Sequence, residues 1–266
     1  MRVSKRLSAG FSRHGPNYRF DDQVDFDEIR DTFGFRTMVV GNWVNKQERL
    51  LAANLIYDAL ADLAQILQLP PEAIGLRKKL NFAFGHGGQK GVQAHYNAHS
   101  QTLALAKNAG GGALAHEWFH AFDHHICQHM FPQRQSMQFC SALWLKQTPG
   151  LSHQLNRYLD QFFHHIFLDI DGKNPNDYVN QSIKFDKAMQ QMYMSMPEEL
   201  AARCFEKCIS THTRITNTFL VSGLNDSGLI YPSDTELYNR VYLLKVLRLK
   251  KAKLFIKLTH RRLKRK

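Results

Sequence analysis

The apolar residues of the chain follow a helical period most clearly in one stretch of its first third. Between Lys46 and Leu69 they recur every three or four positions, at Leu50, Leu51, Leu55, Ile56, Leu60, Leu63 and Leu67. This period places them on one face of a helix. Pro70 and Pro71 cannot continue such a helix, so the pattern predicts a helix over residues 46–69.

Short apolar and β-branched segments flank this helix and predict strands. One precedes it, FGFRTMVVGNWV at residues 33–44, and three follow it: KLNFAFG (79–85), VQAHYN (92–97) and QTLALA (101–106). Only three residues separate the last two segments, which is typical of a β-hairpin.

The second half of the chain is mainly helical by pattern, with helices predicted near 136–168, 179–194 and 195–210. A further helix is predicted within the stretch 111–125, after a glycine-rich turn. The sequence therefore predicts an α+β fold, in which a small mixed sheet packs on this central helix and a helical C-terminal half follows.

The polar residues divide the chain into three parts. Residues 1–30 are polar with little periodicity and predict an N-terminal arm, residues 31–235 predict one domain, and residues 236–266 predict a basic tail. Twelve Lys or Arg residues and no acidic residue lie between Arg240 and Lys266. Removing these twelve from the 35 basic residues leaves 23, equal to the 23 acidic ones. The net charge of +12 therefore belongs to the tail, and residues 240–266 are expected to contact nucleic acid or another anionic surface, or else to be a solvated tail.

The cysteine spacing and the lack of long apolar segments indicate the cellular compartment of the protein. The four cysteines, Cys127, Cys140, Cys204 and Cys208, show no CxxC spacing, which favours a reduced protein. No run of eighteen apolar residues occurs, and no apolar region follows the basic residues at the N-terminus. We therefore expect a cytoplasmic protein with no transmembrane segment.

The central stretch GGALAHEWFHAFDHH (111–125) contains the motif HExxH. Because residues four apart share one face of a helix, His116 and His120 can bind one metal ion, while Glu117 lies to the side and can act as a general base. Asp123 falls on the same stripe and is expected to accept a hydrogen bond from a ligand imidazole. The third ligand of the related metzincin pattern would fall on Ile126, so a third ligand must come from elsewhere.

The best candidate for that ligand is Glu199, in SMPEELAARCFEKC (195–208). His, His and Glu form a common ligand set for catalytic zinc, although manganese or iron could use the same ligands. Glu198 has capping-box spacing to Ser195. Glu199, Arg203 and Glu206 form one stripe, which would equally suit a solvated salt-bridge face. The spacing alone leaves both interpretations, and the choice among the three glutamates, open.

These motifs resemble a known family. FGFRTMVVGNWV, LNFAFGHGGQKGVQAHYN, LALAKNAGGGALAHEWFHAFDHH, PEELAARCFE and IYPSDTEL are similar to the zincin-like metallopeptidase domain of large polyvalent proteins of phages and mobile elements, and most to the bacterial family labelled CLCA_X. The resemblance implies a zincin-like fold, His116, His120 and Glu199 as metal ligands, and Glu117 as catalytic base. Phe119 departs from the glycine common in the broader family, which puts access of a substrate to the site in question.

Two functions follow as hypotheses. The first is a zinc-dependent peptidase acting on a peptide or protein substrate, with Arg203, His95 or Tyr96 stabilising the developing oxyanion and an edge strand pairing with the substrate. The second is a non-catalytic, metal-stabilised module whose basic tail binds nucleic acid or another partner. A catalytic metal site keeps a position open for water, whereas a structural site closes with a fourth protein ligand.

Overall fold

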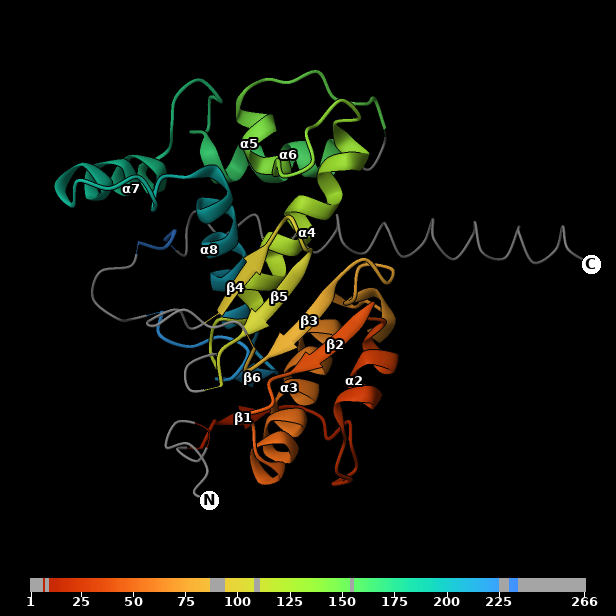
Figure 1. Cartoon of the computed structure of the whole chain (residues 1–266). Coiled ribbons are helices and arrows are strands. Elements are labelled where there is room, and N and C mark those ends of the chain that lie inside the picture. Colours follow the sequence, from red (N-terminus) through yellow and green to blue (C-terminus); the bar gives the residue numbers. More distant parts are fainter. Residues whose placement is uncertain are drawn as a thin grey trace, which may run out of the picture.

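The computed structural model describes residues 7, 10–86, 94–107, 111–153, 156–224 and 230–233, and every structural finding below concerns these residues. They form an α+β fold with seven α-helices and two small sheets (Figure 1). The basic tail expected at 236–266 lies outside the described residues.

The larger sheet is mixed. Its strands are β2 (Thr37–Val40), β3 (Asn81–Phe84), β4 (Ala94–Asn97) and β5 (Thr102–Leu105). Their order is β2-β3-β5-β4, with β2, β3 and β5 parallel and β4 antiparallel to β5. The predicted hairpin is therefore confirmed, and β4 is an edge strand.

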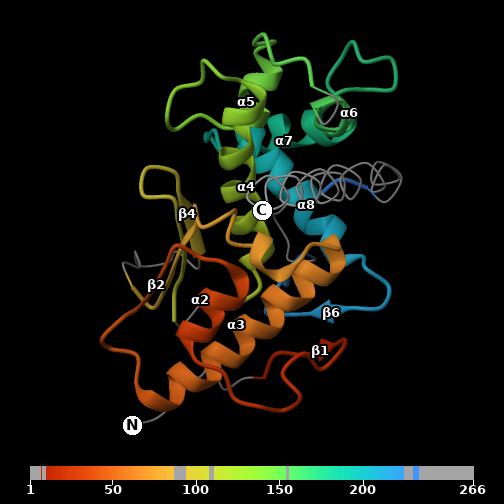
Figure 2. The same ribbon diagram turned by 90° about the vertical axis from the view of Figure 1, so that its right-hand side faces the viewer.

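Helix α4 (Leu114–Met130) packs between this sheet and helix α8 (Pro197–Ser210), as Figures 1 and 2 show. Apolar side chains fill the interface between the two helices: the rings of Trp118 and Phe119 lie 5.7 and 5.0 Å from that of Phe205. The indole N–H of Trp118 donates to the carbonyl of Ile74 at 2.9 Å. Because α4 is buried on both sides, the polar residues of its remaining stripe are held in fixed positions.

Helices α2 (Phe26–Phe33) and α3 (Lys46–Leu67) and the short helix η1 (Pro71–Ala73) complete the first half. Asn45 and Glu48 form a capping box at the start of α3, which fixes where the helix begins. By length and composition, α3 is the one described helix that could cross a membrane, but 61% of its apolar window is buried inside the protein. That burial is what a helix at the centre of a folded core shows.

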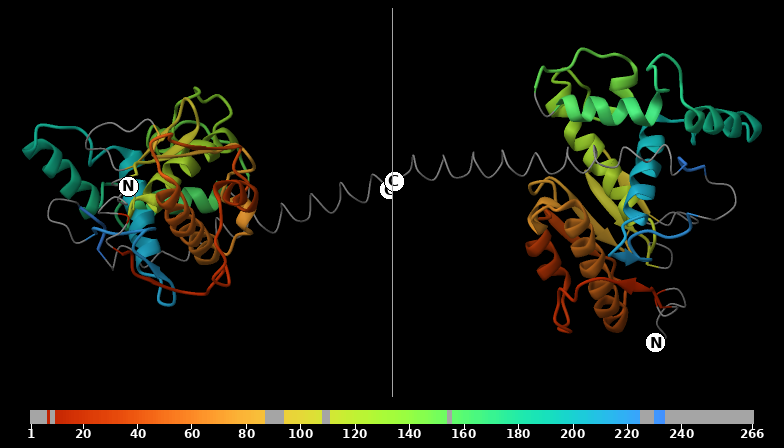
Figure 3. Two further views of the ribbon diagram at one scale, coloured as in Figure 1. Left: turned by 60° about the horizontal axis from the view of Figure 1, so that its bottom comes forward. Right: turned by 180° about the vertical axis from the view of Figure 1, so that it is seen from behind.

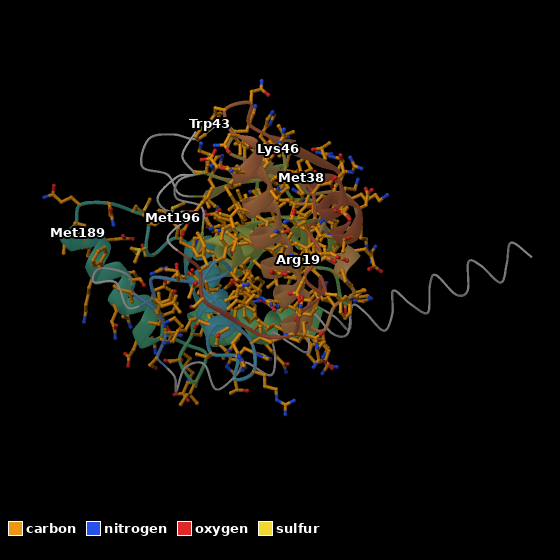
Figure 4. All side chains as sticks on the ribbon, turned by 90° about the horizontal axis from the view of Figure 1, so that it is seen from below. Arg19, Met38, Trp43, Lys46, Met189 and Met196 are labelled. Carbon is orange, nitrogen blue, oxygen red and sulfur yellow. The ribbon has the colours of Figure 1, made fainter. Side chains whose placement is uncertain are left out.

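The second half departs from the predicted helix boundaries. The predicted helix over 136–168 is wrong: the chain forms α5 (Cys140–Leu145) and α6 (Asn156–Phe167) instead. Pro149 and Gly150 separate them, because proline lacks an N–H and disfavours helix at the residue before it. The next helix, α7 (Asp177–Ala188), ends earlier than predicted. It projects from the body in both views of Figure 3, and Met189 at its end lies well outside the packed side chains in Figure 4.

Residues 10–30 do not form a separate arm. Strand β1 (Arg13–His14) pairs with β6 (Thr216–Asn217), and Val24, Phe26 and Ile29 are buried. Both strands meet the fully buried Asp62 of α3, whose carboxylate accepts hydrogen bonds from Arg13 at 2.7 and 2.8 Å and from the amide of Asn217 at 2.8 Å. A buried carboxylate needs such partners. The polar composition of the segment hid this contact from sequence analysis.

Candidate metal centre

The N-terminus of α4 is held by backbone contacts, since Ala113 at its N-cap provides no side-chain hydrogen bond. Gly112 has φ +97° and exchanges two hydrogen bonds with the segment 219–222, donating to the carbonyl of Phe219 at 2.7 Å and accepting from the N–H of Ser222 at 3.0 Å. A side chain at Gly112 would collide with Ser222. The glycine turn therefore fixes where the helix begins and which way its first residues point.

Helices α4 and α8 bring three potential metal ligands together. One donor atom from each of His116, His120 and Glu199 lies within 4.8 Å of the other two. Nε2 of His120 lies 3.0 Å from Nε2 of His116, and the two carboxylate oxygens of Glu199 lie 3.2 Å from His116 Nε2 and 3.3 Å from His120 Nε2. Among the described residues this is the one such cluster.

The cluster fits a tetrahedral zinc ion in its chemistry and its spacing. Zinc–ligand bonds of about 2.0 to 2.1 Å place neighbouring ligand atoms about 3.3 to 3.4 Å apart, close to the distances between these three side chains. Oε2 of Glu199 is buried and lies 3.2 Å from His116 Nε2 without the geometry of a hydrogen bond, and a bound cation would satisfy it. The three residues would hold the ion, and the cluster contains no fourth protein ligand among the described residues.

The ionisation of these groups shows how strongly they interact. Burial lowers the pKa of His116, but the carboxylates of Glu199 and Glu206 outweigh it and raise the pKa to about 10. Burial raises the pKa of Glu199, but the two imidazoles hold it well below its usual range. In the metal-free protein a proton on His116 therefore balances the carboxylates, and a metal ion must displace it.

Sequence analysis left the role of Glu206 open, and the structure places it behind His116. Its Oε2 lies 3.4 Å from Nδ1 of His116, on the opposite side of the ring from the cluster. Glu206 is therefore separated from the cluster by the imidazole. It takes the position of a carboxylate that orients a ligand histidine, the role that the sequence had suggested for Asp123.

Asp123 makes a different contact from the one expected. Its carboxylate accepts hydrogen bonds from the backbone N–H and the hydroxyl of Ser141, at 3.0 and 2.6 Å. Nδ1 of His120 is buried without a hydrogen-bond partner. Asp123 thus joins α4 to α5 and does not orient an imidazole, because α5 supplies two donors that the sequence pattern could not reveal.

The stripe of α8 is buried, which decides between the two interpretations that the spacing left open: Glu199, Arg203 and Glu206 are 9%, 2% and 5% exposed. Arg203 donates to three backbone carbonyls, those of Met194, Glu199 and Ile230. Its guanidinium therefore holds the backbone around α8 and is committed to those carbonyls, which argues against a role at an oxyanion.

The expected capping box at Ser195 and Glu198 is also absent. Helix α8 has Met196 at its N-cap with no side-chain hydrogen bond, and Pro197 begins the helix. Ser195 instead donates to Asp186 from both its N–H and its hydroxyl, at 2.7 and 2.6 Å. Glu198 lies next to Glu199 in the chain but outside the ligand cluster.

The neighbouring side chains of His95 and Tyr96 lie on opposite faces of the sheet. The Tyr96 hydroxyl lies 2.8 Å from Nδ1 of His124, and Nε2 of His124 lies 2.6 Å from the carbonyl of Ser136. Since a carbonyl only accepts, Nε2 carries the proton and Tyr96 donates to Nδ1. Tyr96 thus faces α4, two turns beyond His116, and His95, as its neighbour in the strand, faces the other side of the sheet.

Tyr193 is a residue of the site that sequence analysis missed. Burial of its hydroxyl and the carboxylates of Glu199 and Glu117 raise its pKa well above the ordinary value, although the residue as a whole is 48% exposed. Asp186 fixes this part of the chain by accepting hydrogen bonds from the N–H groups of Tyr193, Met194 and Ser195. The signal in the sequence was weak, because a lone tyrosine after a helix has no distinguishing pattern.

Phe119 does not narrow the site. It is 1% exposed and packs against Phe122, Phe162 and Phe205 in the core. Glu117, on the neighbouring side of the helix, is partly exposed.

Comparison with known proteins finds a match for one part of the chain, which includes one of the two helices of the metal centre. Residues 185–253, 69 of the 266, match the family model described as Large polyvalent protein-associated domain 1. The match includes α8 with Glu199 and Glu206 but not His116 or His120. No curated protein and no solved structure matches the chain. The match supports the large-polyvalent-protein context of the resemblance, and the case for a metal centre rests on the geometry of α4 and α8.

Proposed function

We propose that the protein is a zinc-dependent metallopeptidase of zincin-like architecture, with His116, His120 and Glu199 as ligands. The observation that carries the proposal is the convergence of these three side chains from two helices within 4.8 Å, next to a partly exposed Glu117. Three protein ligands are the number that catalytic zinc sites use, whereas structural sites use four.

The residues have distinct roles in hydrolysis. When bound, zinc supplies a Lewis acid for the scissile carbonyl and lowers the pKa of a water. Glu117 takes a proton from that water as its oxygen attacks the carbonyl carbon, and passes the proton to the leaving amine as the C–N bond breaks. The second proton of the water passes from the new carboxylic acid to the amine, so the products are a carboxylate and an ammonium group and both protons are accounted for.

Tyr193 is the donor that remains for the developing oxyanion. Arg203 is committed to backbone carbonyls and Tyr96 donates to His124, whereas Tyr193 is 48% exposed and its pKa is raised by burial and by Glu199 and Glu117. The edge strand β4 would pair with an extended peptide through its backbone, which makes a peptide or protein the substrate class.

The test uses the full chain loaded with zinc. Wild type should bind one zinc ion, and His116→Ala should lose it, by elemental analysis after dialysis. Glu117→Gln should bind zinc like wild type but cleave a peptide library about 10² to 10⁴ times more slowly, while Glu198→Gln serves as the control and cleaves normally. Unchanged cleavage by Glu117→Gln would show the mechanism to be wrong. Zinc binding with no cleavage of the library would favour the non-catalytic module instead.

A further inference from the structure

Glu206 connects the metal centre to the segment 230–233. On one side its Oε2 faces Nδ1 of His116 at 3.4 Å, and on the other the same oxygen accepts a hydrogen bond from the Tyr231 hydroxyl at 3.1 Å. The carboxylate is 5% exposed, so water competes little for these contacts. A buried anion that serves two donors fixes the orientation of both.

Arg203 holds the same segment one turn earlier on α8. Its guanidinium donates to the carbonyl of Ile230 at 2.6 Å and, through Nε, to the carbonyl of Glu199 at 3.3 Å. At successive turns, the stripe of α8 thus contains the candidate ligand Glu199, Arg203, which binds the carbonyl of Ile230, and Glu206, which binds the hydroxyl of Tyr231. Six residues, which include Asp234 and Glu236, separate this segment from Arg240, the first basic residue of the tail.

We infer that Tyr231 is a positioning residue of the metal centre that acts through Glu206 on His116, and that metal binding and docking of residues 230–233 on α8 stabilise each other. The inference rests on the metal site of the proposed function but not on its catalysis. It gives the segment before the basic tail a position that depends on the metal.

The physical reason lies in the two nitrogens of His116. Nε2 faces His120 and Glu199, so it must be unprotonated to bind a metal ion, and the one proton of the neutral ring then belongs on Nδ1. The Glu206 carboxylate faces that atom at 3.4 Å, which favours the required tautomer, and Tyr231 holds the carboxylate in place. Linkage is reciprocal. If docking of Tyr231 raises the affinity for the metal ion by some factor, metal binding must therefore favour docking of Tyr231 by the same factor.

The experiment measures zinc binding and backbone protection without any substrate. Zinc affinity of the full chain is determined by competition with a chromogenic chelator for wild type, Tyr231→Phe, Glu206→Gln and the double variant. Hydrogen–deuterium exchange of residues 230–233 is compared with and without zinc. Tyr57→Phe, which removes a phenol hydroxyl from α3, is the matched control, and circular dichroism verifies that each variant is folded.

We expect Glu206→Gln to weaken zinc binding about 10- to 100-fold. Tyr231→Phe should weaken it less, by about 3- to 10-fold, because Tyr231 acts on His116 only through Glu206. The double variant should lose little more than Glu206→Gln alone, since both act on one path. Zinc should slow exchange at 230–233 in wild type and Tyr57→Phe but not in Tyr231→Phe. Equal zinc affinities of wild type and Tyr231→Phe, or exchange that zinc leaves unchanged in wild type, would overturn the inference while leaving the peptidase proposal standing. Loss of cleavage activity would bear on the peptidase proposal alone.

Discussion

The carboxylate of Asp123 accepts two hydrogen bonds from Ser141, one from the backbone N–H at 3.0 Å and one from the hydroxyl at 2.6 Å. The pair joins the second half of α4 to the start of α5 in the fully buried core. Burial raises the pKa of Asp123 to about 6, against the opposing effect of the Ser141 hydrogen bonds.

This raised pKa predicts a specific pH dependence of stability. In the folded state Asp123 holds its proton more strongly than in the unfolded state, where its pKa is near 3.8. The free energy of unfolding should therefore fall as the pH rises from about 4 to about 6, by roughly 3 kcal/mol from this group. Denaturant titrations of wild type and Asp123→Asn at several pH values between 4 and 7 measure the difference. An identical pH dependence in the two proteins would rule out this contribution.

Zinc binding should release a proton. His116 has a pKa of about 10 in the metal-free protein, so near neutral pH it is protonated and must lose that proton to bind a metal ion. We expect zinc affinity to rise about tenfold per pH unit between pH 6.5 and 8, with release of about one proton from this residue per ion. Calorimetry in two buffers of different ionisation enthalpy measures the number. Affinity that is independent of pH in this range would contradict the assignment of His116.

Glu199 and Glu198 provide a matched pair of variants. Glu199→Gln removes the charge that faces both imidazoles and should weaken zinc binding by at least about tenfold, as the loss of a ligand or its close partner does. Glu198→Gln removes the same charge one residue away, outside the cluster, and should bind zinc like wild type. Equilibrium dialysis with elemental analysis compares them. Equal losses in both variants would point to a general electrostatic effect and not to a ligand.

Phe119 should contribute to stability and not to substrate access. Phe119→Ala removes a ring that is 1% exposed and touches three aromatic neighbours, so it should cost about 3 to 5 kcal/mol in the free energy of unfolding. Phe119→Leu should cost less because it leaves a smaller cavity. Thermal and denaturant unfolding give the values. Faster peptide cleavage by a folded Phe119→Ala protein would show that the ring does restrict the site.

The ion pair between Arg13 and Asp62 should hold the N-terminal segment in place. Arg13→Ala removes the cation that pairs with the fully buried Asp62 and leaves the hydrogen bond from Asn217, and breaking such a pair should cost about 3 kcal/mol. Arg30→Ala, which removes an arginine from exposed pairs with Asp27 and Asp31, should leave stability unchanged. Limited proteolysis of residues 10–25, together with denaturant unfolding, distinguishes the two. Similar behaviour of both variants would mean that β1 is not anchored through Asp62.

The sequence by itself determined the local elements whose signals lie within a few residues. The period of apolar residues in 46–67, the short spacing of the β4–β5 hairpin and the HExxH spacing depend only on neighbours in the chain, and the structure has each of them. The break between α5 and α6 also has a local cause in Pro149 and Gly150, which the helical pattern of the flanking residues concealed.

Tertiary structure decided every contact that joins distant residues. Whether Glu199 faced solvent or His116 depended on how α8 packs against α4, since the spacing suited both. Glu206, not Asp123, faces His116, because Ser141 of α5 meets Asp123 and α8 carries Glu206 past the far side of the imidazole. Polarity in the sequence cannot show whether a charged residue is solvated or buried with partners. Arg13, Asp62 and Arg203 each stabilise the fold through hydrogen bonds to residues that are distant in the sequence. These partners come together only when the chain folds.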